Sequence, residues 1–493
     1  MDQRRQLFGT AGIRGRYLEK VTPDLAFRIG LAIANYVGGE GTATVGHDVR
    51  TTSPLLAQMA AAGLMAGGLN SLFIGIVPTP VLAYSVPRTN SRAGIMITAS
   101  HNPPPDNGIK VFDAEGMEYT IGMERDIEDI VFNMDPYKLH APWDSVGRFI
   151  QGEEVIEDYM RSLVDKIGIN GRRIPLRIAV DCANGAASMV TPRVLREIGA
   201  EQVISINCHP DGFFPGRPPE PRPDVIAPYI GSVQNLGVHV LFAHDGDADR
   251  LAVSIPGVGF IKQDLLIALY AWYKLRNRKG TIIVSVDVGI EVEEIVEHLG
   301  GRIVRAKLGK IHEKLRQTPG ALLAAEPWKL IDPEWGHWVD GIYQAALLTR
   351  ISLEEKDYPL NLIRRLPFYP SARISIKMHS DEDKIKFFGY FEEEAKAVMS
   401  RGAVKITTLD GIRIEYDDRS WLLLRMSGTE PKIRIYAQAT SRKRLEEILS
   451  LVKKLAFQTS SKLGIELKGL EEHIDYGEAI ASKEKMPEKK ITG

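Results

Sequence analysis

A unit of strand, helix and strand recurs three times in the first three-quarters of this 493-residue chain, and this repeat constrains the fold most. In each copy a β-branched run closes with an Asp, a helix-like stretch stops at glycine, and another strand-like run follows. The copies begin at 42–48, 177–181 and 281–287 and end at 71–74, 202–206 and 302–305. Short apolar strands that alternate with helices indicate parallel sheets covered by helices. We therefore expect an α/β protein with three similar α/β domains whose sheets are mixed and largely parallel.

The last quarter of the chain follows a different pattern. Its strand-like runs are 373–378, 404–406, 412–416, 421–424 and 433–436, and its helix-like stretches are 381–399 and about 441–463. Asp417 and Asp418 suit a hairpin turn between two of these strands. The pattern predicts a C-terminal α+β domain with an antiparallel sheet.

The chain is too long for one hydrophobic core, since a domain holds roughly 150 residues. We expect α/β domains at 1–150, 151–255 and 256–366, and the α+β domain at 367–465. The polar, lysine-rich tail at 466–493 is expected to be partly disordered.

Charge and hydropathy exclude several classes of protein. The chain has 62 Lys and Arg against 63 Asp and Glu, so no net field attracts nucleic acid or an anionic membrane. No run of about 20 apolar residues predicts a membrane span, and the N-terminus lacks the apolar region of a signal peptide. We expect a cytoplasmic protein, monomeric or homodimeric, that binds neither nucleic acid nor membranes.

The two cysteines, Cys182 and Cys208, each follow a strand-like apolar run. We expect both to be buried and reduced, because two cysteines form no disulfide framework and their spacing is not that of a zinc site.

A polar motif, Thr98-Ala-Ser-His-Asn-Pro103, follows the strand-like run 94–97 and leads into further prolines. Ligand sites of α/β proteins gather at the carboxyl edge of parallel strands, so a hydroxyl here is well placed for chemistry. Ser100 can accept a phosphoryl group and pass it on, and His101 can orient it. Taken alone, the motif also fits an ordinary polar turn.

Two neighbouring segments carry cationic side chains. Lys110, in Asp106-Asn-Gly-Ile-Lys110, is a candidate acid–base group or phosphate contact, with a solvated surface lysine as the alternative. The glycine-rich and basic Gly9-Thr-Ala-Gly-Ile-Arg-Gly15 matches no dinucleotide or Walker pattern.

An acidic motif, Asp245-Gly-Asp-Ala-Asp-Arg250, follows the strand-like run 238–243. Carboxylates at alternate positions of an extended loop can point to one side, and three of them suit a hard cation, above all Mg²⁺. An EF-hand is excluded, because Pro256 stands where that loop needs a bidentate Glu. A solvated acidic loop is the weaker alternative, since three close carboxylates repel one another without a cation.

A third motif, Arg425-Met-Ser-Gly-Thr-Glu-Pro431, follows an apolar run. Its serine, glycine and threonine can form a nest of phosphate donors. Arg425 adds a planar fork, and we expect Arg434 to return beside it on the next strand. A structural hairpin turn is the alternative.

Two further segments, Ala324-Ala-Glu-Pro-Trp-Lys329 and Gly336-His-Trp-Val-Asp340, combine carboxylate, aromatic and histidine side chains. This mixture suits the hydroxyls and the apolar face of a sugar, although a packed Trp-rich loop explains it nearly as well.

In these motifs the chain resembles the α-D-phosphohexomutase superfamily, which includes phosphoglucomutase, phosphomannomutase and phosphoglucosamine mutase. The resemblance covers about residues 5–460 and places all four signature loops in the family's order. It implies three related α/β domains, a fourth domain with an antiparallel sheet, and a cleft where four loops meet.

The resemblance also implies a mechanism. Ser100 would carry a phosphoryl group, and three carboxylates would hold Mg²⁺ together with an oxygen of that phosphate: Asp245, Asp247 and Asp249. The phosphoserine gives its phosphoryl group to a sugar phosphate, the sugar 1,6-bisphosphate turns around, and the other phosphate returns to the serine.

Further roles follow by resemblance. Arg14 and Lys110 would be charged catalytic groups beside the phosphoserine, and Arg250 would lie close to the transferred phosphate. The substrate's other phosphate would be bound by Arg425, Ser427, Gly428, Thr429 and Arg434.

The sugar-binding loop departs from the family's Gly-Glu-x-Ser-Gly-His pattern. The corresponding segment is Ala325-Glu326-Pro-Trp-Lys-Leu330, and Gly336-His337 lies downstream. Glu326 is carried over most directly, with Lys329 and His337 as further candidates. The threonine before Ala-Ser-His-Asn-Pro is more typical of gluco- and mannomutases, so we favour these sugars and leave glucosamine and pentoses open.

Two other classes of function compete. A Mg²⁺-dependent sugar phosphatase would share the nucleophile and the metal but would need no clasp for a second phosphate. A sugar-phosphate-binding regulator would need no nucleophile at all. The sequence therefore favours a phosphomutase, which is an isomerase, acting on hexose phosphates.

Overall fold

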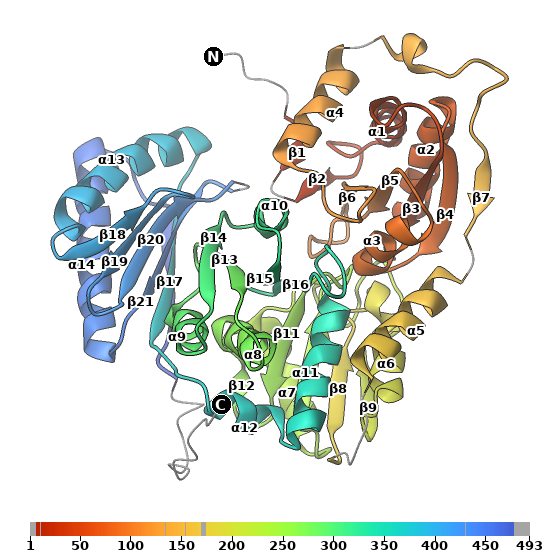
Figure 1. The fold of residues 1–493 in the computed structure, drawn as a ribbon. Coiled ribbons are helices and arrows are strands. Elements are labelled where there is room, and N and C mark those ends of the chain that lie inside the picture. The colour runs from red at the N-terminus through yellow and green to blue at the C-terminus, as the bar shows by residue number, and fades with distance from the viewer. Residues whose placement is uncertain are drawn as a thin grey trace. The chain divides into compact units, whose positions relative to one another are not determined.

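The computed structural model describes residues 6–9, 11–133, 135–152, 154–168, 174–428 and 430–477. Within these ranges the strands form sheets of seven, five, four and six members (Figure 1). The expected fold class is confirmed, since α/β sheets of mixed direction precede a C-terminal antiparallel sheet.

The first sheet has the strand order β1-β2-β6-β5-β3-β4-β7. Its strands are β1 (Phe8–Gly9), β2 (Gly12–Arg16), β3 (Thr42–His47), β4 (Asn70–Ile76), β5 (Ala93–Ile97), β6 (Asp106–Asp113) and β7 (Phe149–Gln151). The strands β5, β3, β4 and β7 are parallel, whereas β1, β2 and β6 pair antiparallel. The accompanying helices are α1 (Pro23–Tyr36), α2 (Ser53–Ala66), α3 (Thr79–Arg88), α4 (Ile121–Asn133) and the short η1 (Pro136–Leu139).

Small residues bring the first two helices close together. A Cβ atom on Gly30 of α1 would lie 2.1 Å from the carbonyl oxygen of Ala60, and one on Gly63 of α2 would lie 2.0 Å from that of Phe27. The two helices therefore pack at backbone distance, and the alanines of α2 fill the core beside them.

The second sheet has the order β12-β11-β10-β8-β9, in which β10, β8 and β9 are parallel and β11 and β12 antiparallel. Its strands are β8 (Arg177–Asp181), β9 (Gln202–Ile206), β10 (Val240–His244), β11 (Leu251–Ile255) and β12 (Gly259–Phe260). Its helices are α5 (Val155–Ile167), η2 (Ala186–Met189), α6 (Thr191–Glu197) and α7 (Pro223–Gln234).

The third sheet has the order β14-β13-β15-β16. Its strands are β13 (Thr281–Ser285), β14 (Arg302–Ala306), β15 (Ala321–Glu326) and β16 (Lys329–Ile331), and β13 and β14 are parallel. The helices in this part of the chain are α8 (Gln263–Leu275), α9 (Ile290–His298), α10 (Ile311–Arg316), α11 (Gly341–Glu355) and α12 (Pro359–Arg364).

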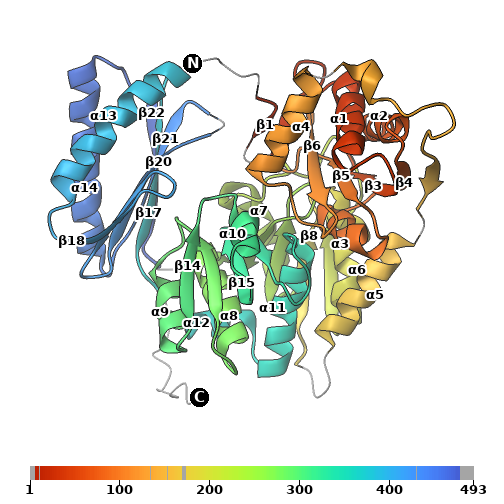
Figure 2. The same ribbon diagram turned by 45° about the horizontal axis from the view of Figure 1, so that its top comes forward.

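The fourth sheet is antiparallel throughout and has the order β18-β19-β20-β21-β17-β22. Its strands are β17 (Ser371–Lys377), β18 (Ala403–Thr407), β19 (Ile412–Tyr416), β20 (Trp421–Met426), β21 (Lys432–Gln438) and β22 (Gly469–Asp475). The helices α13 (Asp381–Met399) and α14 (Arg442–Leu463) pack together beside this sheet (Figure 2). Ser380 and Ser441 cap them by accepting a backbone N–H, which is the usual role of serine at this position.

The strand β22 corrects the expectation for the C-terminal tail in part. Residues 469–475 pair with β17 over its whole length, although their sequence is polar and lies within the expected tail. The last part of the tail, 478–493, lies outside the described residues.

The expectation of two reduced cysteines was wrong, because Cys182 and Cys208 form a disulfide. Each cysteine follows one of two neighbouring parallel strands, β8 and β9, so their Cα atoms come within 4.9 Å of each other. A strand pairing that the sequence did not specify therefore brings the two thiols together.

The chain divides into two compact units. The first comprises Met1–Gln263, Leu322–Ala324 and Trp328–Leu362, and the second comprises Asp264–Ala321, Ala325–Pro327 and Ile363–Gly493. Across the described ranges, every helix is too short or too polar to cross a lipid bilayer.

Candidate active site

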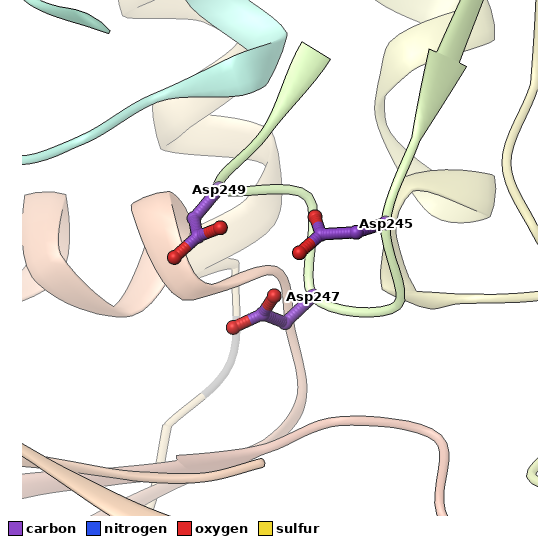
Figure 3. A group of neighbouring side chains, drawn as sticks. All are labelled: Asp245, Asp247 and Asp249. Atoms are coloured by element: carbon purple, nitrogen blue, oxygen red, sulfur yellow. The ribbon is translucent and has the colours of Figure 1, made fainter. Parts of the chain in front are cut away.

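The three carboxylates of the acidic motif converge at the turn between β10 and β11 (Figure 3). The two strands pair antiparallel up to His244 and Leu251, so the intervening residues form a tight loop. Ala248 adopts a positive φ of 61° within it. One oxygen from each of Asp245, Asp247 and Asp249 lies within 4.8 Å of the others, and all three side chains are buried.

This donor set fits a hard cation. One oxygen of Asp247 and one of Asp249, the Oδ1 atom in each case, are buried and have no hydrogen-bond partner among the described residues. Unpartnered carboxylate oxygens away from water are costly unless a cation compensates them. Three such groups on one loop match the oxygen ligands that Mg²⁺ takes.

Lys110 compensates part of this negative charge. Its Nζ atom lies 2.7 Å from Asp247 Oδ2 and 2.8 Å from Asp249 Oδ2, and all three groups are buried. Burial raises the pKa of both carboxyls, but other contacts outweigh it. Lys110 together with the Thr79 hydroxyl lowers the pKa of Asp247, and the charges of Lys110, Lys329 and Arg250 hold that of Asp249 well below its usual range. Asp245, which Lys110 does not pair with, has its pKa raised by burial and by the two neighbouring carboxylates.

Ser100 lies directly beside this loop. It follows β5, and its backbone adopts the left-handed conformation with a φ of 51°. The residue is fully buried. Its Oγ donates a hydrogen bond of 2.5 Å to Asp245 Oδ2, and His101 Nδ1 lies 3.3 Å from the same Oγ. Burial and the charges of Arg250 and Arg14 hold the pKa of His101 well below its usual range, so the imidazole is neutral.

Two arginines complete the cationic side of the site. Arg14 stands on β2 opposite Gly108 of β6, two residues before Lys110. Its Nε and Nη2 atoms are buried without a hydrogen-bond partner among the described residues, and burial lowers its pKa. Arg250 closes the acidic loop, with its Nε 3.8 Å from an oxygen of Asp245 and of Asp249.

The structure places the three candidate residues of the sugar-binding loop in different surroundings. The loop is a two-residue turn between β15 and β16, in which Trp328 has a positive φ of 78°. Lys329 is buried and its Nζ lies 3.9 Å from Asp249 Oδ2. Glu326 accepts a 2.6 Å hydrogen bond from the backbone N–H of Gly309, and His337 is half-buried in the loop before α11.

The expected return of Arg434 beside Arg425 is confirmed, since the two residues are cross-strand partners of β20 and β21. The turn that joins these strands is held by a hydrogen bond from Ser427 N to the Lys432 carbonyl oxygen. Gly428 is exposed at its tip, and Thr429, also expected here, lies outside the described residues.

Sequence reasoning missed several residues that support these loops. Thr79 donates a 2.6 Å hydrogen bond to Asp247 Oδ2, and its backbone N–H binds the Asp247 carbonyl oxygen. Lys384 of α13 donates to the carbonyl oxygens of Ser427 and Glu430, beneath the arginine-bearing turn. No local signal marks these residues, because their partners come from other parts of the chain.

The first compact unit therefore brings together the groups that phosphoryl transfer requires. A buried hydroxyl lies in hydrogen-bond contact with a carboxylate cage, and several cations surround both: Arg14, Lys110, Arg250 and Lys329. This combination offers a nucleophile, a place for a divalent cation and positive charge for a phosphoryl group. Glu326 and the turn between Arg425 and Arg434 belong to the second unit.

The chain is similar to known proteins over most of its length. Residues 5–138, 157–257 and 380–455 match domain I, domain II and the C-terminal domain of phosphoglucomutase/phosphomannomutase. A phosphopentomutase of Thermococcus kodakarensis is 42% identical over 93% of this chain and 98% of its own length. A probable phosphoglucosamine mutase of Methanopyrus kandleri is 39% identical over 90% of this chain and 95% of its own.

A solved structure agrees with these matches. A phosphoglucomutase/phosphomannomutase family protein from Burkholderia thailandensis superposes with a TM-score of 0.81 and 27% identity, covering 94% of this chain and 99% of its own. The chain therefore belongs to the α-D-phosphohexomutase superfamily. It is a phosphomutase and hence an isomerase.

Proposed function

We propose that this phosphomutase interconverts a sugar 1-phosphate and the isomer phosphorylated at its terminal carbon, with Ser100 as the phosphoryl carrier. The observation that supports this most is the 2.5 Å hydrogen bond from the buried Ser100 Oγ to a carboxylate of the acidic loop. At this position the Ser100 hydroxyl can exchange its proton for a phosphoryl group. The nearby lysine and arginine side chains then offset the negative charge of that group.

The chemistry has two transfers that balance each other. In the first, a free hydroxyl of the sugar phosphate attacks phosphoserine, and the P–O bond to Ser100 Oγ breaks. In the second, Ser100 Oγ attacks the other phosphate of the sugar bisphosphate, and that P–O bond to the sugar breaks. Each half-reaction moves one proton between a hydroxyl and a base, and the phosphoserine is regenerated.

The charged side chains have distinct tasks in this scheme. Lys110 is buried, Arg14 is half-buried with its Nε and Nη2 atoms covered, and both stabilise negative charge on the transferring oxygens. The neutral imidazole of His101 stays within hydrogen-bond reach of Ser100 Oγ and orients it. Asp245, Asp247 and Asp249 would hold Mg²⁺, which supplies Lewis-acid polarisation of phosphoryl oxygens when it is bound.

The second compact unit supplies what a phosphatase would not need. Arg425 and Arg434 stand opposite each other across β20 and β21. Paired guanidinium groups beside an exposed glycine turn suit the non-reacting phosphate of a sugar phosphate. This clasp favours a mutase with a bisphosphate intermediate.

The preference for glucose or mannose rested on Thr98, and the structure gives this residue another task. Thr98 is fully buried, donates to Asp48 Oδ2 and accepts from Ser100 N, so it supports the nucleophile loop rather than a sugar. The 42% identical relative is a phosphopentomutase, and several relatives of 34–39% identity are probable phosphoglucosamine mutases. We therefore place pentose phosphates first and glucosamine phosphates second, ahead of glucose and mannose.

Phosphorus NMR tests this proposal. The 1-phosphates of ribose, glucosamine, glucose and mannose are each incubated with the protein, Mg²⁺ and a trace of the matching sugar bisphosphate. We expect a terminal phosphate to appear fastest with ribose, and no conversion with the Ser100→Ala variant. Inorganic phosphate as the sole product would instead establish a phosphatase.

A further inference from the structure

Arg50 is a fully buried arginine whose guanidinium donors all have partners. Nε donates to Asp48 Oδ2 at 3.0 Å, which pairs the two charges inside the protein. The other four donors reach backbone carbonyl oxygens at 2.6 to 3.0 Å: those of Ser100, Asn102, Pro103 and Asp106. A guanidinium has five N–H groups, so none is left over.

All four carbonyl groups belong to the loop that carries the nucleophile. This loop leaves β5 after Ile97 and enters β6 at Asp106, and Ser100 holds a positive φ within it. A non-glycine residue in the left-handed region costs free energy, and surrounding contacts must maintain it. Arg50 provides those contacts from the connection between β3 and α2, about fifty residues earlier in the chain.

Asp48 reaches the same loop by a second route. Its Oδ2 accepts a 2.7 Å hydrogen bond from the Thr98 hydroxyl, and Thr98 Oγ1 in turn accepts one of 2.8 Å from the backbone N–H of Ser100. Its Oδ1 accepts from Ser53 Oγ at the start of α2. The backbone on both sides of the Ser100 side chain is therefore fixed, the N–H through Thr98 and the C=O through Arg50.

A corresponding pair serves the acidic loop. Asp181 is the last residue of β8, just as Asp48 directly follows β3. The Oδ2 atom of Asp181 accepts a 2.8 Å hydrogen bond from Arg217 Nε. Arg217 Nη2 donates at 2.6 Å to the carbonyl oxygen of His244, the residue immediately before Asp245. Both side chains are buried. In the first two of the three repeat copies, a carboxylate at the end of the first strand thus anchors an arginine, and each arginine holds one loop of the candidate site.

We propose that the buried pairs Asp48–Arg50 and Asp181–Arg217 are positioning residues of the phosphoryl-transfer site, the first for Ser100 and the second for the acidic loop. This inference rests on the proposed function of Ser100. Phosphoryl transfer depends on placement, and a misplacement of about 1 Å can lower the rate about 100-fold. Rigid backbone anchors are therefore required where the nucleophile and the cation-binding loop meet.

Substitutions in the two pairs should affect different loops, so a variant of one pair serves as the matched control for a variant of the other. Arg50→Lys keeps the charge but cannot reach four carbonyl groups, and we expect kcat to fall about 100-fold with little change in KM. Arg217→Lys should instead weaken Mg²⁺ binding about 10-fold to 100-fold, measured by titration calorimetry on the metal-free protein.

Hydrogen exchange followed by mass spectrometry reports the anchoring directly. Arg50→Lys should accelerate exchange of amides in residues 98–106 and leave residues 245–250 protected, and Arg217→Lys should do the reverse. Thr98→Val removes only the hydroxyl relay and should lower kcat, while Thr98→Ser restores it. These two threonine variants decide the question for Asp48 and Arg50 if Arg50→Lys fails to fold.

The outcomes separate this inference from the proposed function. If the wild-type protein converts no sugar phosphate, the proposed function fails, but exchange rates and Mg²⁺ affinity still decide whether the pairs anchor the loops. Unchanged loop exchange together with wild-type kcat and Mg²⁺ affinity in the folded variants would overturn the inference. Equal acceleration of exchange in both loops by either variant would also overturn it, because it would indicate general loss of structure.

Discussion

Ser100 Oγ donates its hydrogen bond to Asp245, the one carboxylate of the acidic loop that Lys110 does not pair with. The three aspartates therefore have different environments in the described structure. Two have their charge compensated by a lysine, and the third, with a raised pKa, faces the nucleophile. This difference links the serine to the cation-binding loop and motivates the first two predictions.

Ser100→Ala should abolish turnover while the fold remains intact. The substitution removes the hydroxyl that would carry the phosphoryl group, and alanine fits the space that serine leaves. Phosphorus NMR measures turnover, and intact mass after incubation with a sugar bisphosphate measures phosphoprotein formation. Ser254→Ala, which changes another buried serine in β11, is the control and should keep both signals. Residual phosphorylation of Ser100→Ala would refute the assignment of the carrier.

Lys110→Met should destabilise the metal-free protein more than the Mg²⁺-bound protein. Removal of the ammonium takes the nearest cation from the buried Asp247 and Asp249, and among the described residues only Lys329 and Arg250, at 3.9 and 3.8 Å from Asp249, remain close. Loss of one partner of a buried ion pair costs up to about 3–5 kcal/mol. A bound Mg²⁺ would supply positive charge to the same carboxylates and reduce the loss. Urea unfolding in EDTA and in Mg²⁺ measures the difference, with Lys396→Met, a half-buried lysine on α13, as the control. Equal losses in both conditions would argue against a cation at this loop.

Arg413→Met should destabilise the second compact unit and change its response to acid. Arg413 is 1% exposed, donates at 2.7 Å to Glu415 and to the Val286 carbonyl oxygen, and stacks 3.9 Å above the Trp421 ring. Burial raises the pKa of Glu415, but the Arg413 charge and hydrogen bond outweigh it, so the folded-state pKa lies below the ordinary 4.5.

The lowered folded-state pKa of Glu415 makes the stability of the folded protein depend on pH. A carboxyl with a depressed folded-state pKa stabilises the protein fully above its unfolded pKa, near 4.5, and this contribution is lost as pH falls through the folded-state value. The Arg413→Met variant should therefore lose less stability than the wild type as pH falls below about 4.5. Thermal unfolding between pH 3 and 7 measures this effect, and parallel curves for both proteins would contradict it.

The disulfide should be detectable by thiol counting. Unfolded, unreduced protein should react with no thiol reagent, and two thiols should appear after reduction. Reduction should lower the free energy of unfolding by about 3 kcal/mol, since the bond closes a loop across a sequence separation of 26 residues. Cys182→Ser should show the same loss without reductant. Two free thiols in the unreduced protein would restore the expectation drawn from the sequence.

Local patterns predicted much of this fold. The β-branched runs at 42–48, 177–181 and 281–287 became β3, β8 and β13, because strand and helix periodicities depend on near neighbours in the chain. The acidic loop was also predictable, since aspartates at alternate positions of an extended segment point to the same side.

Partners that are distant in sequence were not predictable in the same way. The strand β22 has a polar sequence and was assigned to the tail, yet it pairs with β17 because an edge of that sheet offers it backbone hydrogen bonds. The residues Thr79, Arg50 and Lys384 each bind a loop far away in the chain, and nothing in their local sequence marks them.

The sequence by itself determined many of the strands and helices and the chemical groups of the site, because these depend on residue type and short-range spacing. Only the tertiary structure decided that Ser100 meets Asp245, that Lys110 pairs with two aspartates, and that Cys182 bonds to Cys208. Such contacts depend on which strand ends adjoin in a sheet, and strand order is fixed by the packing of the whole core rather than by any one segment.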